Sequence, residues 1–172
     1  MNEDTLRGKR MLAVDDEPDI LAVLGEELDK SGVQLDTATN FDEARQRMLS
    51  YSYDLVILDI MGVQGFDLLT LATLRNIPAV MLTAHALSPE ALKKSVLLGA
   101  RAYVPKDEID KIAPFLEDVL TLSFEAAWKA HLTKLAGYFG AHFGPDWRKS
   151  EKEFWDEFEK NLDVKESTII QS

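Results

Sequence analysis

Five polar side chains stand at or just beyond the ends of short apolar runs in this sequence: Asp15, Asp16, Asp59, Thr83 and Lys106. If the runs are parallel strands of one sheet, their carboxyl ends meet along one edge, and the five side chains converge there. Three carboxylates in one crevice repel one another, and a hard divalent cation held by oxygen ligands relieves that repulsion. The pattern therefore predicts a cation site, with Mg²⁺ as the abundant candidate.

The same five residues suit the transfer of a phosphoryl group. With a cation on one side, the ammonium of Lys106 on another and the hydroxyl of Thr83 on a third, the crevice offers partners for three phosphoryl oxygens. Asp59 follows the most apolar run and faces both the cation and the lysine, which suits a nucleophile that forms an acyl phosphate. The adjacent Asp15 and Asp16 suit cation binding, one directly and the other through water.

The elements that would position these side chains follow from the hydrophobic pattern. Short apolar runs predict five strands, at 11–14, 33–36, 55–58, 79–82 and 102–104. Longer stretches with apolar residues three or four apart predict helices at 20–31, 41–50, 66–76 and 89–98. A fifth helix is expected to begin near Asp107 or Asp110, with Pro114 in its first turn. The alternation predicts a doubly wound parallel α/β sheet with helices on both faces, and the second strand, which alternates in polarity, is expected at an edge.

The sequence changes character after about Ser123. Aromatic residues become frequent, and two amphipathic stripes predict two helices, with Gly140, Gly144 and Pro145 breaking the chain between them. Residues 163–172 are expected to form a frayed tail. We therefore expect two domains, an α/β domain over residues 1–123 and a helical extension over residues 124–172.

The first of the two stripes has more than one interpretation. It contains Trp128, Leu132, Leu135 and Phe139 at helical spacing. Packing within the chain is the simpler explanation of such a stripe. One alternative is a homodimer formed through the fifth helix and the C-terminal helices, and another is that the two helices fold back over the α/β domain as a lid.

Composition restricts the class of protein. With 172 residues, of which 46% are hydrophobic and 28% charged, the chain suits one ordinary domain and an appendage. The sequence contains no cysteine, which excludes disulfides, thiolate metal sites and cysteine nucleophiles. A net charge of −11 disfavours nucleic acid binding through general phosphate attraction and favours protein partners and cations. Since no apolar stretch is long enough to cross a membrane and the N-terminus is polar, a cytoplasmic protein without membrane contact is expected.

Four segments of the sequence carry a resemblance to a known family. They are Leu12–Pro18, Asp54–Met61, Met81–Ala84 and Gly99–Lys106. In this order and spacing they resemble the receiver domain of two-component response regulators, over about residues 9–121. The resemblance implies a flavodoxin-like fold whose five parallel strands lie in the order 2-1-3-4-5.

The resemblance also implies roles for the acidic crevice. Asp59 matches the residue that accepts a phosphoryl group from a histidine kinase. Asp15 and Asp16 match the acidic pair that holds Mg²⁺, and the backbone carbonyl of Met61 matches a further protein contact to the metal, beside Asp59. Lys106 matches the lysine that pairs with the acceptor and then with the phosphoryl group.

Two further residues match the family's switch. Thr83 matches the hydroxyl that moves toward the phosphoryl oxygen, and Tyr103 matches the aromatic residue whose rotamer follows it inward. In the family this movement reshapes the face made by the fourth helix, the fifth strand and the fifth helix, where partners or a second receiver dock. A new dianionic group that biases a two-state element is consistent with the same interpretation.

Two departures from the family pattern concern the loops of the site. After Asp59 the segment Met61–Asp67 lacks the usual proline and is about two residues short, so we expect a reshaped loop. Proline ordinarily follows the conserved lysine, but here Pro105 precedes Lys106 and Asp107 follows it. Because a cis bond before a residue other than proline costs roughly 3 kcal/mol, we expect a trans bond or an altered loop at this point.

These features predict a phosphoacceptor switch rather than an enzyme with turnover, with a histidine kinase or phosphotransfer protein upstream and a protein target downstream. A transcription regulator with a minimal DNA-binding output is an alternative, although residues 124–172 carry a net charge of −2 and no basic recognition helix. A phosphatase of the haloacid dehalogenase type also attacks phosphorus with an aspartate. That class needs a second aspartate two residues beyond the nucleophile, where Met61 stands here.

Overall fold

A single parallel sheet organises the first part of the chain. The computed structural model describes residues 5–84, 88–149 and 152–160. The five strands are β1 (Arg10–Val14), β2 (Gln34–Ala38), β3 (Leu55–Asp59), β4 (Ala79–Thr83) and β5 (Ala102–Pro105). All neighbours pair in parallel, in the order β2-β1-β3-β4-β5. The predicted flavodoxin-like fold, its strand order and the edge position of the second strand are therefore confirmed.

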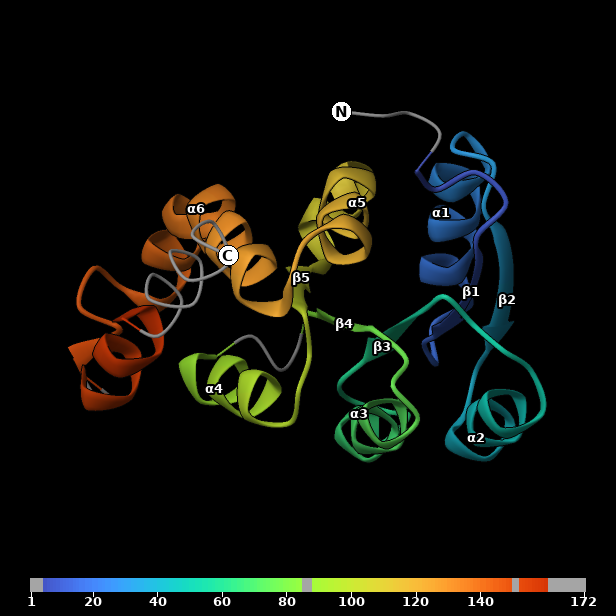
Figure 1. Cartoon of the computed structure of the whole chain (residues 1–172), viewed down its shortest axis with the longest axis horizontal. Helices are drawn as coiled ribbons and strands as arrows, with labels where there is room; N and C mark the ends of the chain where they lie inside the picture. Colours follow the sequence, from blue (N-terminus) through green and yellow to red (C-terminus); the bar gives the residue numbers. More distant parts are fainter. Residues whose placement is uncertain (1–4, 85–87, 150–151, 161–172) are drawn as a thin grey trace, which may run out of the picture. The chain divides into compact units, whose positions relative to one another are not determined.

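Helices cover both faces of this sheet. They are α1 (Pro18–Asp29), α2 (Phe41–Ser50), α3 (Gly65–Leu74), α4 (Pro89–Leu97) and α5 (Ile112–Thr121). Figure 1 shows α1 and α5 on one face and α2, α3 and α4 on the other. With both faces covered, every residue of β3, β4 and β5 is buried, which explains why β3 and β4 are apolar up to their last residues, Asp59 and Thr83.

The register of the sheet aligns the polar strand ends. Val14 pairs with Leu58, so Asp15 comes level with Asp59. On the other side of β3, Asp59 pairs with Leu82, and Thr83 at the end of β4 pairs with Pro105, the residue before Lys106. The buried strands therefore place the polar side chains along one edge of the sheet.

Local signals explain where α1, α2 and α4 begin. Pro18 occupies the first turn of α1, where its missing N–H has no partner to lose, so this helix begins two residues earlier than predicted. Asn40 caps α2, since its Oδ1 accepts a hydrogen bond of 2.9 Å from the backbone N–H of Glu43. Ser88 caps α4 in the same way, through the N–H of Ala91 at 3.0 Å.

The segment after β5 differs from the expected fifth helix. Residues Lys106–Lys111 form a 3₁₀ helix, η1, and α5 begins only at Ile112. Pro114 still lies in the first turn of α5, as predicted. The described residues contain no cis peptide bond, so the bond after Lys106 is trans, one of the two outcomes expected for this departure.

The chain divides into two compact units, residues 1–121 and 122–172. In the second unit, α6 (Phe124–Phe143) begins at the Ser123 cap and ends at Gly144, which has a φ of 92°. The predicted break at Gly140 is therefore wrong, although the break at Gly144 is observed. A single glycine inside a helix costs only about 1 kcal/mol, and the Phe139 and Phe143 rings that stack on either side of it, 5.4 Å apart, help to offset this cost.

Aromatic rings form the interior of this second unit. A second helical segment covers residues 152–160, and the predicted tail at 163–172 lies outside the described residues. The Trp128 ring contacts the Phe158 ring edge-on at 6.2 Å, and Trp147 contacts Trp155 edge-on at 5.1 Å. Trp128, Leu132, Leu135 and Phe139, which suggested a dimer, are all buried within the chain. Packing therefore accounts for that stripe.

Among the described residues, no helix has the length and apolarity needed to cross a bilayer.

The α2 cap can be tested directly. Asn40→Ala removes the acceptor of the Glu43 N–H, and we expect it to lower the free energy of unfolding by about 1 kcal/mol. Chemical denaturation of both proteins at pH 7 measures the difference. Asn40→Asp keeps an acceptor in place and should retain the stability of the natural chain. Equal losses in the two variants would contradict the capping role.

Candidate functional site

Three side chains meet at the carboxyl edge of the sheet. Lys106 extends from the start of η1, and its Nζ lies 3.0 Å from Oδ2 of Asp15 and 3.5 Å from Oδ1 of Asp59. The Lys106 side chain is 7% exposed, and Asp15 and Asp59 are almost fully buried. The expected convergence of these three groups is therefore present. A charged cluster so well shielded from water interacts strongly, because little solvent screens it.

The protein holds Asp15 firmly in this cluster. The backbone N–H of Glu17 donates to Oδ1 of Asp15 at 2.9 Å, while Oδ2 faces Lys106. Glu17 itself turns back toward the cluster, with its Oε1 3.6 Å from Nζ of Lys106. The lysine is thus surrounded by three carboxylates. The approach of Glu17 to Lys106 follows from the fold.

Burial and mutual repulsion shift the proton affinities of this cluster. Burial, followed by the negative charge of Asp15, raises the pKa of Asp59 from 3.8 to about 6, although Lys106 opposes the shift. Burial also raises the pKa of Asp15, against the hydrogen bond from Glu17 and the pairing with Lys106. Burial lowers the pKa of Lys106, but the hydrogen bond to Asp15 and the charges of Asp59 and Asp15 raise it by more. The net shift of the pKa is upward, so the ammonium stays charged. Too much negative charge therefore remains for one lysine to neutralise.

The donor set suits a hard divalent cation. Ligand oxygens of Asp15, Asp16 and Glu17 all lie within 4.8 Å of one another. Carboxylate oxygens are the ligands that Mg²⁺ prefers, and a cation here would also reduce the repulsion that raises the pKa of Asp59. This set contains Glu17, whereas the predicted set contains Asp59 and the Met61 carbonyl beside Asp15 and Asp16, but its donor chemistry suits the cation that the sequence predicts.

The turn between β3 and α3 closes the site on one side. Residues 61–64 form this turn, and α3 begins at Gly65, whose N–H donates to the carbonyl of Ile60 at 3.1 Å. A Cβ on Gly65 would collide with the carbonyl of Asp59, so only glycine fits there. The Met61 residue is 56% exposed. The shortened loop is thus a tight turn packed against the end of β3.

Thr83 and Tyr103 form a second group next to the charged cluster. Thr83 ends β4 and is buried, and its hydroxyl oxygen is shielded from solvent. Tyr103 on β5 is fully buried, and its hydroxyl oxygen accepts a hydrogen bond of 3.3 Å from the N–H of Ser88. Burial raises the pKa of Tyr103 to about 12, against smaller effects of Ser88 and Thr83. The aromatic side chain therefore lies inward and links β5 to the cap of α4.

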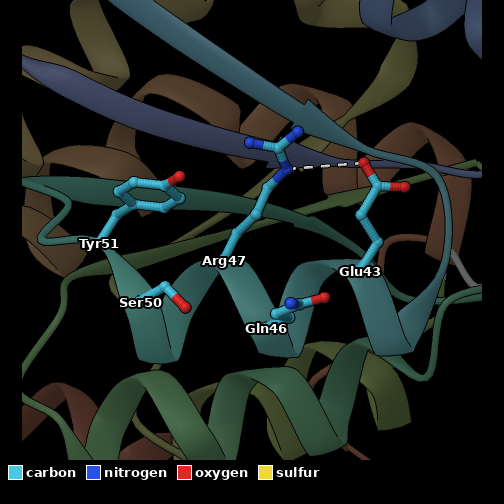
Figure 2. Close-up of a pocket in the computed structure, with 5 residues that line it drawn as sticks. All are labelled: Glu43, Gln46, Arg47, Ser50 and Tyr51. Atoms are coloured by element: carbon cyan, nitrogen blue, oxygen red, sulfur yellow. Dashed lines mark ion pairs between the residues drawn. The ribbon is translucent and has the colours of Figure 1, made fainter.

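The structure also shows a surface pocket on α2 and a histidine in the second unit, neither of which belongs to the predicted site. A surface pocket of about 280 Å³ runs along α2, lined by Glu43, Gln46, Arg47, Ser50 and Tyr51, and Figure 2 shows the ion pair of 3.5 Å between Arg47 and Glu43 in it. None of its lining residues belongs to the acidic cluster. In the second unit, His131 packs edge-on against the rings of Trp128 and Phe139.

Comparisons with known proteins agree on one type of domain. A family model described as the response regulator receiver domain matches residues 11–114. The sensory/regulatory protein RpfC of Xanthomonas campestris pv. campestris is 29% identical over 143 residues, which are 78% of this chain and 20% of that protein. A transcriptional regulatory protein, the CpxR homolog of Haemophilus influenzae, is 34% identical over 105 residues, which are 59% of this chain and 45% of that protein. The chain therefore spans less than half the length of these curated relatives.

A solved structure gives the same result for the fold. The response regulator protein TrrA of Thermotoga maritima, crystallised in complex with Mg²⁺ and BeF, superposes with a TM-score of 0.57 and 36% identity. The superposition covers 65% of this chain and 99% of that protein. The similarity thus takes in nearly the whole of a receiver protein.

The electrostatic strain on Asp59 predicts a stabilising substitution. Its folded pKa of about 6 lies above the unfolded value of 3.8, so ionised Asp59 opposes folding at neutral pH by at most about 3 kcal/mol. We expect Asp59→Asn to raise the free energy of unfolding at pH 7 without Mg²⁺. The advantage should shrink as the pH falls from about 6 toward 4, where Asp59 becomes protonated in the native chain. Denaturation curves at several pH values measure this difference.

Asp36 provides a control of opposite sign. Burial alone would raise its pKa, but hydrogen bonds from the Tyr53 hydroxyl at 2.7 Å and the Arg10 guanidinium at 3.1 Å lower it more. Its ionised form therefore stabilises the fold above pH 4, and this contribution is lost as the pH falls through the lowered pKa. Asp36→Asn should destabilise the chain at pH 7. If both variants shift stability in the same direction, the charge analysis of Asp59 is wrong.

Proposed function

The chain belongs to the response regulator receiver domain family, and on this basis we propose that Asp59 is the phosphoryl acceptor of a two-component signalling switch. The observation that carries the proposal is the convergence of Asp59, Asp15 and Lys106 at the carboxyl edge of the sheet. The group at position 59 has both a nucleophilic oxygen and a nearby cationic partner for the incoming charge.

The chemistry follows from the state of Asp59. With a pKa of about 6, its carboxylate is mostly ionised at pH 7 and can attack phosphorus without a separate base. A bond forms between a carboxylate oxygen and phosphorus, while the bond from phosphorus to the donor breaks and its electron pair leaves with the donor. A phosphohistidine imidazole or the acetate of acetyl phosphate can serve as that leaving group. The product is an acyl phosphate on Asp59.

The neighbouring residues stabilise charge during this transfer. Lys106 keeps its proton and pairs with the phosphoryl oxygens, since Nζ already lies 3.5 Å from Asp59 Oδ1. Asp15, Asp16, Asp59 and the backbone carbonyl of Met61 would hold Mg²⁺. When bound, Mg²⁺ supplies Lewis-acid stabilisation of the phosphoryl oxygens. The complex of TrrA with Mg²⁺ and BeF supports this assignment by similarity.

The signal is carried by a change in shape rather than by turnover. Thr83 supplies a hydroxyl for one phosphoryl oxygen, and Tyr103 packs inward beside it. Because Tyr103 accepts a hydrogen bond from the N–H of Ser88, a movement of Thr83 and Tyr103 reaches the cap of α4. The face made by α4, β5 and α5 is then the surface that a downstream protein reads. Self-dephosphorylation resets the switch, and no other catalysis is proposed.

The upstream partner is a histidine kinase or a phosphotransfer protein, as in two-component signalling generally. The unit formed by residues 122–172 is the candidate output element. A transcriptional role is the second candidate, because several curated relatives are transcriptional regulators. The acidic character of residues 124–172 opposes it. A gel shift with DNA at physiological salt distinguishes the two, since a signalling module without DNA output gives no retarded band.

Phosphorylation can be measured on the intact chain. Incubation with acetyl phosphate and Mg²⁺ should add one phosphoryl group by intact mass, and chelation of Mg²⁺ should prevent it. Asp59→Asn should remove the modification. The matched control is Asp54→Asn at the other end of β3, where the Asp54 carboxylate accepts a hydrogen bond from the Arg10 N–H. Modification that persists in Asp59→Asn, or that disappears in Asp54→Asn alone, would refute the assignment.

The switch residues predict a second result. Thr83→Ala should leave Asp59 able to accept the phosphoryl group but should abolish the phosphorylation-dependent changes in amide chemical shifts of Tyr103 and α4. The physical reason is that the substitution removes the hydroxyl that links the phosphoryl oxygen to Tyr103. Thr70→Ala, at an exposed position of α3, serves as the control and should respond as the natural chain does. Unchanged responses in Thr83→Ala would exclude the hydroxyl from the switch.

A further inference from the structure

We propose that Gly62 is a positioning residue for the cation site, because its lack of a side chain leaves the space that the Asp16 carboxylate occupies. The inference rests on the proposed function, since it assigns Asp16 to the cation next to Asp59. It adds a residue of the β3–α3 turn to the site. Gly62 touches neither the phosphoryl group nor the cation, and it acts through Asp16 alone.

Two independent observations require glycine at this position. The φ of Gly62 is 84°, in the left-handed region where a residue with a Cβ is strained. A Cβ on Gly62 would also meet the end of the Asp16 side chain, 2.6 Å from Cγ and 3.0 Å from Oδ1. The turn after β3 and the acidic pair after β1 are thus in direct contact.

The contact falls on the side chain that can move. Asp16 is exposed, and its carboxylate is the end of a short rotatable side chain, so it can turn away from a methyl group at position 62. Asp15 has no such freedom, because it is buried between the N–H of Glu17 and Nζ of Lys106. A methyl group at position 62 would therefore displace one carboxylate of the acidic pair and leave the other in place.

The short turn explains why this contact exists. Residues 61–64 complete the connection, and α3 begins at Gly65, where a Cβ would collide with the Asp59 carbonyl. Two glycines thus hold the turn close, one against the acidic pair and one against β3. A connection this tight makes the orientation of Asp16 depend on the turn.

The test is a Mg²⁺ titration of Gly62→Ala in the full chain, followed by amide chemical shifts. We expect the half-saturating Mg²⁺ concentration to rise about ten- to hundredfold, the range seen when a group that orients a metal ligand is lost. The matched control is Gly8→Ala. Gly8 has a φ of 76°, so alanine suffers similar backbone strain, but nothing lies within 4 Å of the added Cβ. Its Mg²⁺ affinity should match that of the natural chain.

A double-mutant cycle separates positioning from a general structural effect. On an Asp16→Ala background there is no carboxylate to displace, so Gly62→Ala should cause no further loss of Mg²⁺ affinity. Its effect on the unfolding midpoint should also fall to that of Gly8→Ala. Additive losses of affinity would mean that Gly62 acts by another route, and the proposal would be wrong.

The natural chain distinguishes failure of this inference from failure of the proposed function. If the natural chain binds no Mg²⁺ and accepts no phosphoryl group, the proposed function fails and the inference fails with it. If the natural chain binds Mg²⁺ and Gly62→Ala binds it equally well, only the positioning role is overturned. If Gly62→Ala fails to fold while Gly8→Ala folds, the test moves to the double variant that combines Gly62→Ala with Asp16→Ala. A double variant that folds supports the positioning role, and one that does not fold overturns it.

Discussion

The repulsion among Asp15, Glu17 and Asp59 around the ammonium of Lys106 is the constraint on which the rest of the site depends. One lysine cannot neutralise three carboxylates, two of which, Asp15 and Asp59, are largely withdrawn from water, and burial together with the negative charge of Asp15 raises the pKa of Asp59. The apolar strands around this site hold the arrangement together. β3, β4 and β5 are buried along their whole length, so the hydrophobic burial of the strands holds together groups that would otherwise separate. A site in this condition gains from any added positive charge, which supports the proposed cation site next to Lys106.

Much of this arrangement could be predicted from the sequence because it follows from short-range signals. The apolar runs define the strands, and parallel strands bring their carboxyl ends to one edge, so the approach of Asp15, Asp59 and Lys106 follows from pattern alone. Two details could not be predicted from the sequence, the 3₁₀ helix after β5 and the contact between the β3–α3 turn and the acidic pair. The 3₁₀ helix at Lys106–Lys111 has no distinctive sequence signal. The contact between Gly62 and Asp16 joins residues that are far apart in the chain, and only the fold reveals it.

The interiors of the two units consist of different side chains, aliphatic in the first and largely aromatic in the second. Residues 1–121 bury aliphatic strands between two layers of helices, an arrangement that leaves the strand ends free for polar groups. The described residues of the second unit bury large rings instead, with Trp128, Phe139 and Trp155 among the most buried side chains. Edge-on aromatic contacts stabilise this unit, since each ring buries a large area at little conformational cost. The continuation of α6 through Gly140 is one result, because helix propensity is outweighed by this packing.

The distribution of tryptophan has a practical consequence. All three tryptophans of the chain, Trp128, Trp147 and Trp155, lie in the second unit, whereas the acidic cluster lies in the first. Ultraviolet emission excited at the indole band therefore reports on the second unit, with no indole in the first to obscure it. A change in that emission when the acidic cluster is modified would reveal communication between the units, and the natural chain carries this optical reporter without any label.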